Sequence, residues 1–400
     1  MPDARLPMPV ARSASAAPAP PAIPFYSPDL GEAELRALQA TLASRRLAGG
    51  AGQTERCHRL LAATLPDSLP LLTQSCTAAL EMAALLLGLQ PGDEVIMPSW
   101  TFCSTANAVL LRGAVPIFAD VREDTLNLDA AAVAAAVTPR SRAVICVHYA
   151  GVGCDMAALQ AVCRQHGLAL VEDAAQAVGA RWAGQPLGGF GVLGAFSYHA
   201  SKNVTCGEGG ALLVNDPALR DRAEILWEKG TDRLRFQRGE VARYSWQDVG
   251  SSFLPSEITA ALLAVQLARV EEITEKRLAV WQRYDALLAP LAGNWGLRRP
   301  QIPQAAAHNG HIYHLRFPSR ALRDHVLARL AAERIGASTH YEPLHLSAAG
   351  RRFGRAPGPL PVTEDAGATL LRLPLYGDLP PGEQERVVER LEAALAAIPH

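Results

Sequence analysis

From about residue 70 onward, short apolar runs alternate with stretches of helical length and pattern. Apolar runs of four or five residues bounded by turn residues are typical of buried strands. We predict strands at 69–73, 94–97, 115–119, 143–147, 168–172, 195–198 and 211–214. We predict helices at 77–87, 101–111, 129–136 and 155–166. This alternation is typical of βαβ units, so the sequence predicts an α/β fold with a mainly parallel sheet and helices on both faces.

The pattern changes near residue 256. Ser256 is a suitable helix N-cap, and a long helical stretch follows it at 257–288. Pro290 and Gly293 are expected to end that helix. Strand-like segments then mix with helical ones, which predicts a smaller C-terminal α+β domain. Its expected strands are 311–317 and 370–374, and its expected helices are 319–333 and 382–397.

The chain therefore divides into three parts. Residues 1–22 are rich in Ala, Pro and Ser and lack the apolar core of a signal peptide, so we expect a disordered tail. Residues 23–275 form the large domain, and residues 276–400 form the small one.

Composition and charge narrow the classes of partner. Lys and Arg number 38 and Asp and Glu number 39, a net charge of −1, so no overall field favours nucleic acid or an anionic membrane. The apolar runs are too short to span a bilayer. The seven cysteines are odd in number and form no C-x-x-C pair, which argues against a disulfide framework or a thiolate zinc site. We expect a cytoplasmic protein with no nucleic-acid or membrane partner.

Polar side chains follow two of the predicted strands. Asp173 ends one strand, and Ser197, His199 and Lys202 follow the next. Ligands of such sheets bind beyond the carboxyl ends of the strands. A lysine that bonds the cofactor and an aspartate that pairs with its pyridinium nitrogen are what a pyridoxal phosphate site requires. The spacing of Asp173 and Lys202 alone also fits a surface ion pair.

Two further strand ends offer groups that suit this cofactor. Residues 75–77 lie at the start of a predicted helix, whose free N–H groups can bind phosphate; an ordinary N-cap is the alternative. Trp100 follows the strand at 94–97 and could stack on a flat ring, although a tryptophan in the core would look the same.

Several segments together resemble the DegT/DnrJ/EryC1/StrS aminotransferases, which are fold-type-I pyridoxal phosphate enzymes acting on nucleotide-linked keto sugars. They are VEDAAQA at 171–177, GAFSYHASKN at 194–203 and GEGG at 207–210. The likeness extends over nearly the whole chain from about residue 24. The segments at 75–86, 228–233, 246–253 and 340–345 resemble the branch of dTDP-4-amino-4,6-dideoxygalactose transaminases.

The resemblance implies roles around pyridoxal phosphate in the large domain. Lys202 is the cofactor-bonding lysine and moves the proton. Asp173 pairs with the ring nitrogen, and Gln176 lies on the side of the phenolic oxygen. The other implied cofactor contacts are Trp100, stacked on the ring, and Cys76, Thr77 and Ser197, at the phosphate.

Ser252 stands where most of the family has an asparagine that reaches the phosphate from the neighbouring subunit. Serine is shorter and makes fewer hydrogen bonds. The resemblance implies a homodimer with shared active sites, and whether Ser252 bonds the phosphate directly is open.

The implied substrate-binding residues are His199, Glu208, His311, Tyr341 and His345. His308, His311 and His314 recur every three residues, which could suggest a metal site. No carboxylate or cysteine accompanies them at ligand spacing, so we expect none.

The implied reaction takes an amino group from L-glutamate to C4 of dTDP-4-keto-6-deoxy-D-glucose. The product is dTDP-4-amino-4,6-dideoxy-D-galactose, for cell-surface polysaccharide synthesis. The alternatives are another nucleotide-linked keto sugar or a sensor that binds the cofactor without turnover. A related dehydratase carries histidine in place of the lysine, so Lys202 argues against that activity.

Overall fold

The computed structural model describes residues 21–397. The expected disordered tail at 1–22 therefore lies, except for its last two residues, outside the described residues. Within 21–397, no helix is both long enough and apolar enough to cross a membrane.

A seven-stranded sheet forms the centre of the molecule, with the strand order β1-β9-β8-β5-β4-β2-β3. Neighbouring strands are parallel except at β9, which is antiparallel to both β1 and β8. The strands are β1 (Leu69–Thr73), β2 (Glu94–Pro98), β3 (Val115–Ala119), β4 (Ser141–Val147), β5 (Ala169–Asp173), β8 (Leu193–Ser197) and β9 (Gly210–Val214). All seven predicted strands are present, and the predicted α/β class is confirmed.

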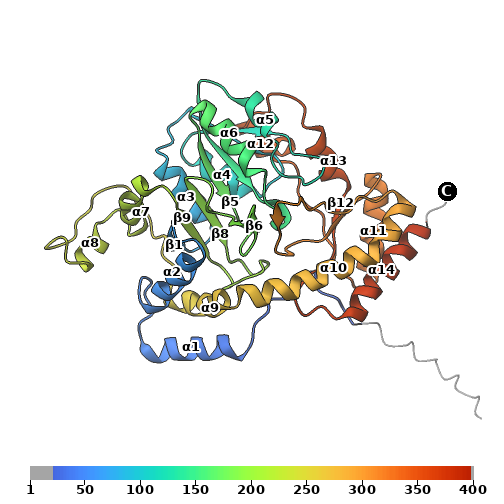
Figure 1. The fold of residues 1–400 in the computed structure, drawn as a ribbon, viewed down its shortest axis with the longest axis horizontal. Coiled ribbons are helices and arrows are strands. Elements are labelled where there is room, and N and C mark those ends of the chain that lie inside the picture. The colour runs from blue at the N-terminus through green and yellow to red at the C-terminus, as the bar shows by residue number, and fades with distance from the viewer. Residues whose placement is uncertain (1–20, 398–400) are drawn as a thin grey trace, which may run out of the picture.

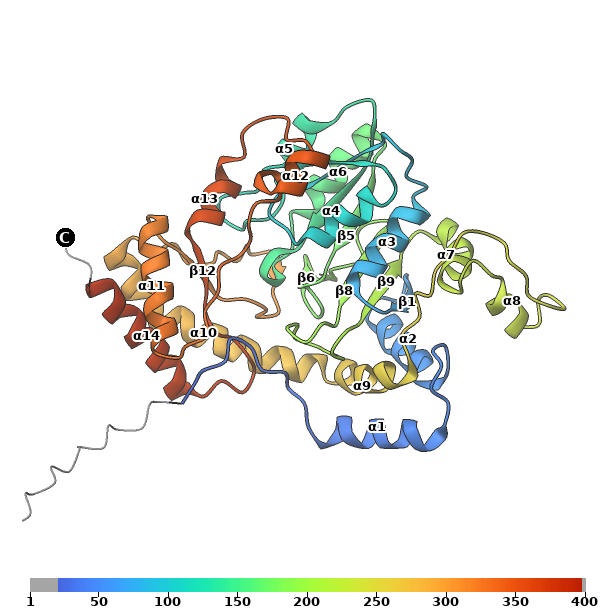
Figure 2. The ribbon, with the colours of Figure 1, turned by 180° about the vertical axis from the view of Figure 1, so that it is seen from behind.

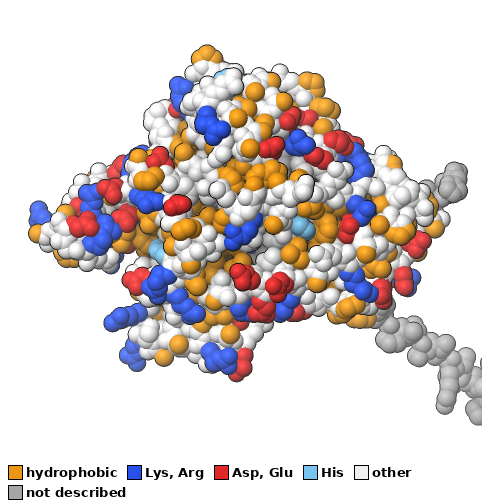
Figure 3. All heavy atoms as spheres, viewed as in Figure 1, with side chains coloured by type: hydrophobic (Ala, Val, Ile, Leu, Met, Phe, Trp, Pro, Cys, Tyr) orange, Lys and Arg blue, Asp and Glu red, His pale blue; other side chains and the backbone are white. Residues whose placement is uncertain are grey.

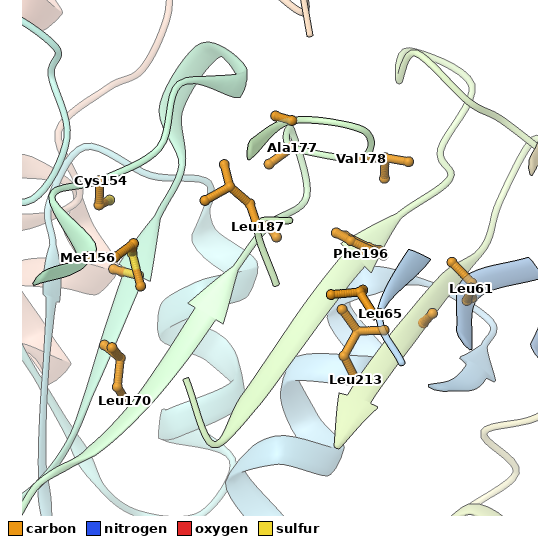
Figure 4. Packing of buried hydrophobic residues seen from close by; sticks show 14 of the residues in the cluster. Leu61, Leu65, Cys154, Met156, Leu170, Ala177, Val178, Leu187, Phe196 and Leu213 are labelled. Carbon is orange, nitrogen blue, oxygen red and sulfur yellow. The ribbon is translucent and has the colours of Figure 1, made fainter. Parts of the chain in front are cut away.

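Helices cover both faces of this sheet (Figures 1 and 2). One face packs against α2 (Gly52–Thr64), α5 (Ala130–Ala136), α6 (Met156–His166) and α9 (Glu257–Ala268). The other packs against α3 (Cys76–Leu86), α4 (Cys103–Leu110) and α7 (Arg220–Trp227). Figure 4 shows Leu61 of α2 and Leu65, which follows α2 directly, beside Phe196 and Leu213 of the sheet.

Burial on both faces explains why the strands are continuous apolar runs. In β4, Val144 and Cys146 belong to one core cluster, and Ala143 and Ile145 belong to the other. Successive side chains of a strand point to opposite faces, so a strand between two helical layers needs apolar residues at every position.

The long helix predicted at 257–288 is wrong in two respects. The backbone breaks at Arg269 (φ −112°, ψ 13°), and α10 (Val270–Trp295) then continues through Pro290. Leu288, Leu291 and Ala292 of its last turns are buried in a third core cluster. This packing offsets the cost of about 3 kcal/mol for proline inside a helix.

The third cluster forms a smaller body at the far end of α10 (Figure 1). It contains α11 (Arg320–Ala332), α14 (Pro381–Ala396) and the pair β11 (His314–Arg316) with β12 (Leu370–Arg372). The two strands are shorter than predicted, because only three residues of each pair with the other.

The expected boundary at 275/276 lies inside α10, where Ile273 packs in the first cluster and Val280 in the third. It stays a prediction. Ile23 also packs in the third cluster, so the start of the expected large domain lies against the small body.

The remaining elements connect or flank these layers. α1 (Glu32–Ser44) packs on α9, and α8 (Arg233–Gln237) projects beyond α7 (Figure 2). The others are the strands β6 (Arg181–Trp182), β7 (Gln185–Pro186) and β10 (Ala306–Ala307), the helices α12 (Ala348–Phe353) and α13 (Pro361–Thr369), and the short turns η1 (Tyr149–Gly151), η2 (Pro217–Leu219) and η3 (Leu344–Leu346).

Candidate active site

A cavity of about 520 Å³ lies where the carboxyl ends of the central strands meet the small body. Residues at or just after the carboxyl ends of β1, β2, β4, β5 and β8 line one side of it. Residues 311–312, 340–341, 372–373 and 375 line another. Phe25 and Tyr26 of the N-terminal segment also reach it. The site therefore depends on three separate parts of the chain.

One end of the cavity is the start of α3. Ser75 caps this helix by accepting a hydrogen bond from the Ala78 N–H (3.1 Å). The N–H groups of Cys76 and Thr77 have no partner within the helix, because the first turn never has one. A Cβ atom at Gly210 would lie 2.4–2.5 Å from backbone atoms of Ser75 and Cys76, so only glycine lets β9 pass this close. The result is an open group of donors that suits a phosphate.

Asp173 lines the cavity at the end of β5. Its Oδ2 accepts a hydrogen bond from the Thr105 hydroxyl (2.8 Å), and its Oδ1 accepts one from the Ala175 N–H (3.2 Å). Since Thr105 donates to Asp173, it accepts from Thr101 (2.8 Å). Burial raises the pKa of Asp173, while these donors and the charge of Lys202 oppose the rise.

Lys202 lines the same cavity from the loop between β8 and β9. Its backbone N–H donates to the His199 carbonyl (2.9 Å), which fixes the turn that carries the side chain. Burial lowers the pKa of Lys202, and the charge of Arg372 adds to this effect. A lowered pKa increases the fraction of neutral amine, the form that can accept a proton.

Gln176 and Tyr341 meet beside Asp173. The Gln176 side-chain oxygen accepts from the Ala150 N–H (2.7 Å), which leaves its Nε2 to donate to the Tyr341 hydroxyl (2.8 Å). The Tyr341 hydroxyl hydrogen is therefore free to donate to another acceptor.

Comparison with known protein families identifies the kind of enzyme to which these residues belong. Residues 28–392 match the model of the DegT/DnrJ/EryC1/StrS aminotransferase family. The chain belongs to this family. It is thus a pyridoxal phosphate-dependent aminotransferase of fold type I, as the sequence predicts.

Solved structures agree with this assignment. The aminotransferase TlmJ from Streptoalloteichus hindustanus is 34% identical, with a TM-score of 0.86 over 94% of this chain and 99% of its own. DesV from S. venezuelae is 32% identical, with a TM-score of 0.86 over 95% and 100%. Spr1654 from Streptococcus pneumoniae, in its pyridoxal phosphate form, is 26% identical, with a TM-score of 0.86 over 95% of this chain and 100% of its own.

The cavity of this aminotransferase fits the cofactor by its own chemistry. The free N–H groups at the start of α3 suit the phosphate, the Asp173 carboxylate suits a protonated ring nitrogen, and Lys202 supplies the amine. When bound, pyridoxal phosphate supplies an electron sink for a carbanion at the donor's α-carbon.

The structure brings together ten of the thirteen predicted site residues. Those that line the cavity are Cys76, Thr77, Asp173, Gln176, Ser197, His199, Lys202, Glu208, His311 and Tyr341. Glu208 lies 3.5 Å from His199 at the exposed rim. His311 donates from Nδ1 to Asn203 Oδ1 (2.7 Å), because the Asn203 amide nitrogen already donates to the Asn309 carbonyl. Their roles toward the cofactor and substrate stay proposals.

The structure does not place Trp100 against the cavity. Its ring is fully buried and packs edge-on against Tyr149 and Tyr341 (5.6 and 5.5 Å between ring centroids). Phe102, two residues on, lines the cavity and is 60% exposed. That Trp100 stacks on the cofactor ring stays a prediction, and Phe102 is a second aromatic side chain after β2 that could take this place.

The structure also holds His345 away from the cavity lining. Ser99 Oγ accepts a hydrogen bond from the His345 backbone N–H (3.0 Å) and lies 2.7 Å from His345 Nδ1. The other ring nitrogen, Nε2, lies 3.3 Å from Glu364 Oε1. Both ring nitrogens have partners within the chain, and the binding of substrate by His345 stays a prediction.

Ser252 is exposed and does not line the cavity of its own chain. It pairs with Glu228 in an isolated β-bridge at the base of the projecting segment that carries α8. This position neither supports nor excludes a contact with a neighbouring subunit.

Sequence reasoning missed Thr105 and Arg372. Thr105 faces Asp173 across 68 positions, and Arg372 reaches the cavity from β12. The only sequence signal was that each stands in or beside a predicted element.

Among residues 21–397, the histidines at 308, 311 and 314 are not among the side chains whose ligand atoms come together as a metal site would need. His308 packs against Trp281, and His314 packs against Tyr149. A different group, Cys146, His148 and Cys154, brings its ligand atoms within 4.8 Å.

The hydrogen bonds of that group occupy the histidine ring. His148 Nδ1 accepts from the Cys154 N–H (3.2 Å), so its Nε2 donates to Glu172 (2.9 Å). No ring lone pair is left for a metal ion.

Proposed function

We propose that this aminotransferase moves the amino group of L-glutamate to C4 of dTDP-4-keto-6-deoxy-D-glucose. The product is dTDP-4-amino-4,6-dideoxy-D-galactose, a precursor for cell-surface polysaccharide. The enzyme acts in the cytoplasm. The observation that carries the amino-transfer proposal is that Lys202, Asp173 and the start of α3 share one cavity.

The side chains divide the work of this reaction. The N–H groups at the start of α3 and the Ser197 hydroxyl hold the cofactor phosphate. Asp173 keeps the ring nitrogen protonated, and Phe102 packs on the ring face. Lys202, whose pKa is lowered by burial, accepts the proton from the donor's α-carbon and returns it at the cofactor.

The polar side chains at the rim of the cavity favour a polar substrate, such as a sugar, beside the amino donor. His199 and Glu208 lie together there, and Tyr341 has a free hydroxyl hydrogen deeper in. Donors and acceptors of this kind suit the hydroxyl groups of a sugar. The choice of the C4 keto sugar rests on the resemblance of residues 75–86 and 246–253 to one branch of the family.

We propose further that two copies share their active sites. The segment that carries α8 projects from the body, and charged side chains gather on it (Figure 3). This segment also exposes large apolar side chains to solvent, and Trp246 is 80% exposed. The others are Phe236, Tyr244 and Val249. Burial against a second copy would remove this apolar surface from water and would carry Ser252 toward the partner's cavity.

The decisive experiment incubates the holoenzyme with dTDP-4-keto-6-deoxyglucose and L-glutamate. We expect 2-oxoglutarate and a 4-amino sugar to form in equal amounts. The NMR spectrum of the sugar should show a small H3–H4 coupling, because the amine at C4 of the galacto product is axial. The matched control is Lys202→Ala, which should give neither product. If only a 3-keto sugar is aminated, the assignment of C4 as the reacting carbon is refuted. If no 2-oxoglutarate forms, the assignment of L-glutamate as the amino donor is refuted.

A further inference from the structure

His311 presents one ring nitrogen to the cavity and is otherwise enclosed. It lines the cavity, and only 9% of the residue is exposed. Its Nδ1 donates to the Asn203 side-chain oxygen (2.7 Å), because the Asn203 amide nitrogen donates to the Asn309 carbonyl (2.8 Å). A neutral imidazole that donates from Nδ1 carries a lone pair on Nε2. The His311 Nε2 atom is therefore a hydrogen-bond acceptor.

This acceptor has no partner within the described chain. Among residues 21–397, no donor lies within hydrogen-bond distance of His311 Nε2, and the atom is not sealed from the open space of the cavity. Polar atoms in the interior of a protein are nearly always hydrogen-bonded, so an acceptor without a partner calls for an explanation. Its place in the lining of the cavity indicates that its donor lies in the cavity.

The contacts around His311 fix the position of Nε2. The His311 backbone N–H donates to Asn309 Oδ1 (3.1 Å), and Arg277 Nη2 donates to the His311 carbonyl (2.9 Å). The Asn309 amide nitrogen donates to two carbonyls of the segment after β5 (2.9 Å each), so this residue is fixed as well. The ring cannot turn without breaking its bond to Asn203. The direction of the Nε2 lone pair is therefore set before a substrate enters.

The surroundings of His311 keep its ring neutral. Burial lowers the pKa of His311 well below its usual value. The groups whose charges act on it most strongly are Lys202, Arg277, Arg372 and His340. They come from the loop after β8, from α10, from β12 and from the segment before η3, and each of them is positive or neutral. A ring that stays neutral is a poor proton carrier at neutral pH, but it remains an acceptor throughout the working range.

Lys202 is the donor that these positions favour. Asn203, which holds the His311 ring, follows Lys202 directly in the chain. Lys202 and His311 line the same cavity, and Lys202 is the charged group that acts most strongly on His311. An amine at the end of a flexible four-carbon side chain needs a partner to hold it in one direction. A hydroxyl group of the sugar is the alternative donor.

We infer that His311 accepts a hydrogen bond from the Lys202 amine through Nε2 and thereby directs the lone pair of that amine toward the α-carbon hydrogen of the amino donor. A neutral amine has two hydrogens and one lone pair, so holding one hydrogen restricts the direction of the lone pair. Orientation of this kind lowers the barrier to proton transfer. His311 is thus a positioning residue that acts through Lys202. The inference rests on the proposed amino transfer by Lys202, but not on which keto sugar is used.

The first measurement compares His311→Leu with His311→Gln by single-turnover absorbance of the holoenzyme. Both variants lose the bond to Asn203, but the glutamine amide oxygen can lie where Nε2 lay, so the difference between them reports the acceptor. His311→Leu should slow the half-reactions with glutamate and with the keto sugar by about 10- to 100-fold at saturation, because a small misplacement of a catalytic group has effects of this order. Half-saturating concentrations should change less than about threefold, because ground-state binding is untouched. His311→Gln should recover most of the rate.

The second measurement needs no substrate. Cyanate carbamoylates only neutral amines, so the pH dependence of Lys202 labelling in the apoprotein, followed by peptide mass spectrometry, reports the protonation of its amine. An acceptor favours the charged form of the lysine, so the labelling curve of His311→Leu should move to lower pH, and that of His311→Gln should stay near wild type. Lys229, which is exposed outside the cavity, is the internal control. His166→Leu, exposed on α6, is the matched control variant and should behave as wild type.

The inference requires both effects. Unchanged rates at saturation in His311→Leu, an unmoved labelling curve, or a His311→Gln variant as slow as His311→Leu would each overturn it. A defect confined to half-saturation by the keto sugar would also overturn it and would assign Nε2 to a sugar hydroxyl. If His311→Leu does not fold, Asn203→Asp decides. Its carboxylate favours protonation of His311 and turns Nε2 into a donor, so both half-reactions should slow most at acidic pH, and unchanged rates would refute the inference.

Failure of the proposed function has a different signature. A wild-type enzyme that turns over neither glutamate nor the keto sugar would refute the proposed reaction, whereas the labelling curves of Lys202 would still decide whether His311 holds its amine. Normal turnover by the wild type, with identical labelling curves in wild type and His311→Leu, would leave the proposed function standing and refute the role of His311.

Discussion

Replacing Thr105 with valine tests how the protein keeps Asp173 charged. Valine has nearly the shape of threonine, so Thr105→Val removes the hydroxyl and leaves the volume. The change deletes the 2.8 Å hydrogen bond to Asp173 Oδ2 and leaves the Thr101 hydroxyl without its partner. Thr105 is fully buried and Asp173 is 5% exposed, so bulk water cannot replace the lost donor.

The expected effect is large because the acceptor is an ion. A hydrogen bond to a charged group contributes about 1.5–3 kcal/mol. Burial already raises the pKa of Asp173, and the Thr105 hydroxyl opposes that rise. Without it, the pKa rises further and the neutral acid, which pairs poorly with a protonated ring nitrogen, becomes easier to form. We expect cofactor affinity to fall by about 10- to 150-fold, since 1.4 kcal/mol is a factor of ten.

The assay is an absorbance titration of the apoprotein with pyridoxal phosphate between pH 6 and 8. The loss should be greatest at the acidic end, because there a carboxyl with a raised pKa is protonated most. Thr105→Ser keeps the hydroxyl and should bind within about threefold of wild type. Wild-type affinity in Thr105→Val across this pH range would show that Asp173 does not depend on this hydroxyl and would refute the reasoning.

Three further predictions concern the site and the dimer. Lys202→Ala should abolish transamination without unfolding, and borohydride should fix the cofactor to Lys202 in the wild type; near-normal turnover of the variant would overturn the site. Phe102→Ala should weaken cofactor binding about tenfold, because it removes an aromatic stacking contact that contributes about 1 kcal/mol or more. Trp100→Phe should change stability more than cofactor binding. A larger loss of cofactor affinity in Trp100→Phe than in Phe102→Ala would show that Trp100 stacks on the ring instead. Mixed dimers of Lys202→Ala with Ser252→Trp should regain up to about half the wild-type activity, because one site escapes both defects; no recovery in verified mixed dimers would remove Ser252 from the partner's site.

The sequence by itself determined the central sheet and the two ends of the cofactor site. Seven apolar runs became seven strands, because a strand covered by helices on both faces must be apolar at every position. Asp173 and Lys202 followed two such strands, and the carboxyl ends of parallel strands meet at one edge. Their meeting in one cavity was therefore predictable from their positions alone.

The tertiary structure alone decided which side chains face the cavity. Trp100 and Phe102 both follow β2, and only the path of the chain into α4 places the first in an aromatic cluster and the second in the lining of the cavity. Thr105, His311 and Arg372 reach the site across 68 positions or more, through packing between helices and the small body that no local pattern encodes. Likewise, α10 continues through Pro290 because Leu288 and Leu291 are buried beside it. Local patterns set the elements, but contacts distant in sequence oriented their side chains, because burial energies between elements exceed local preferences.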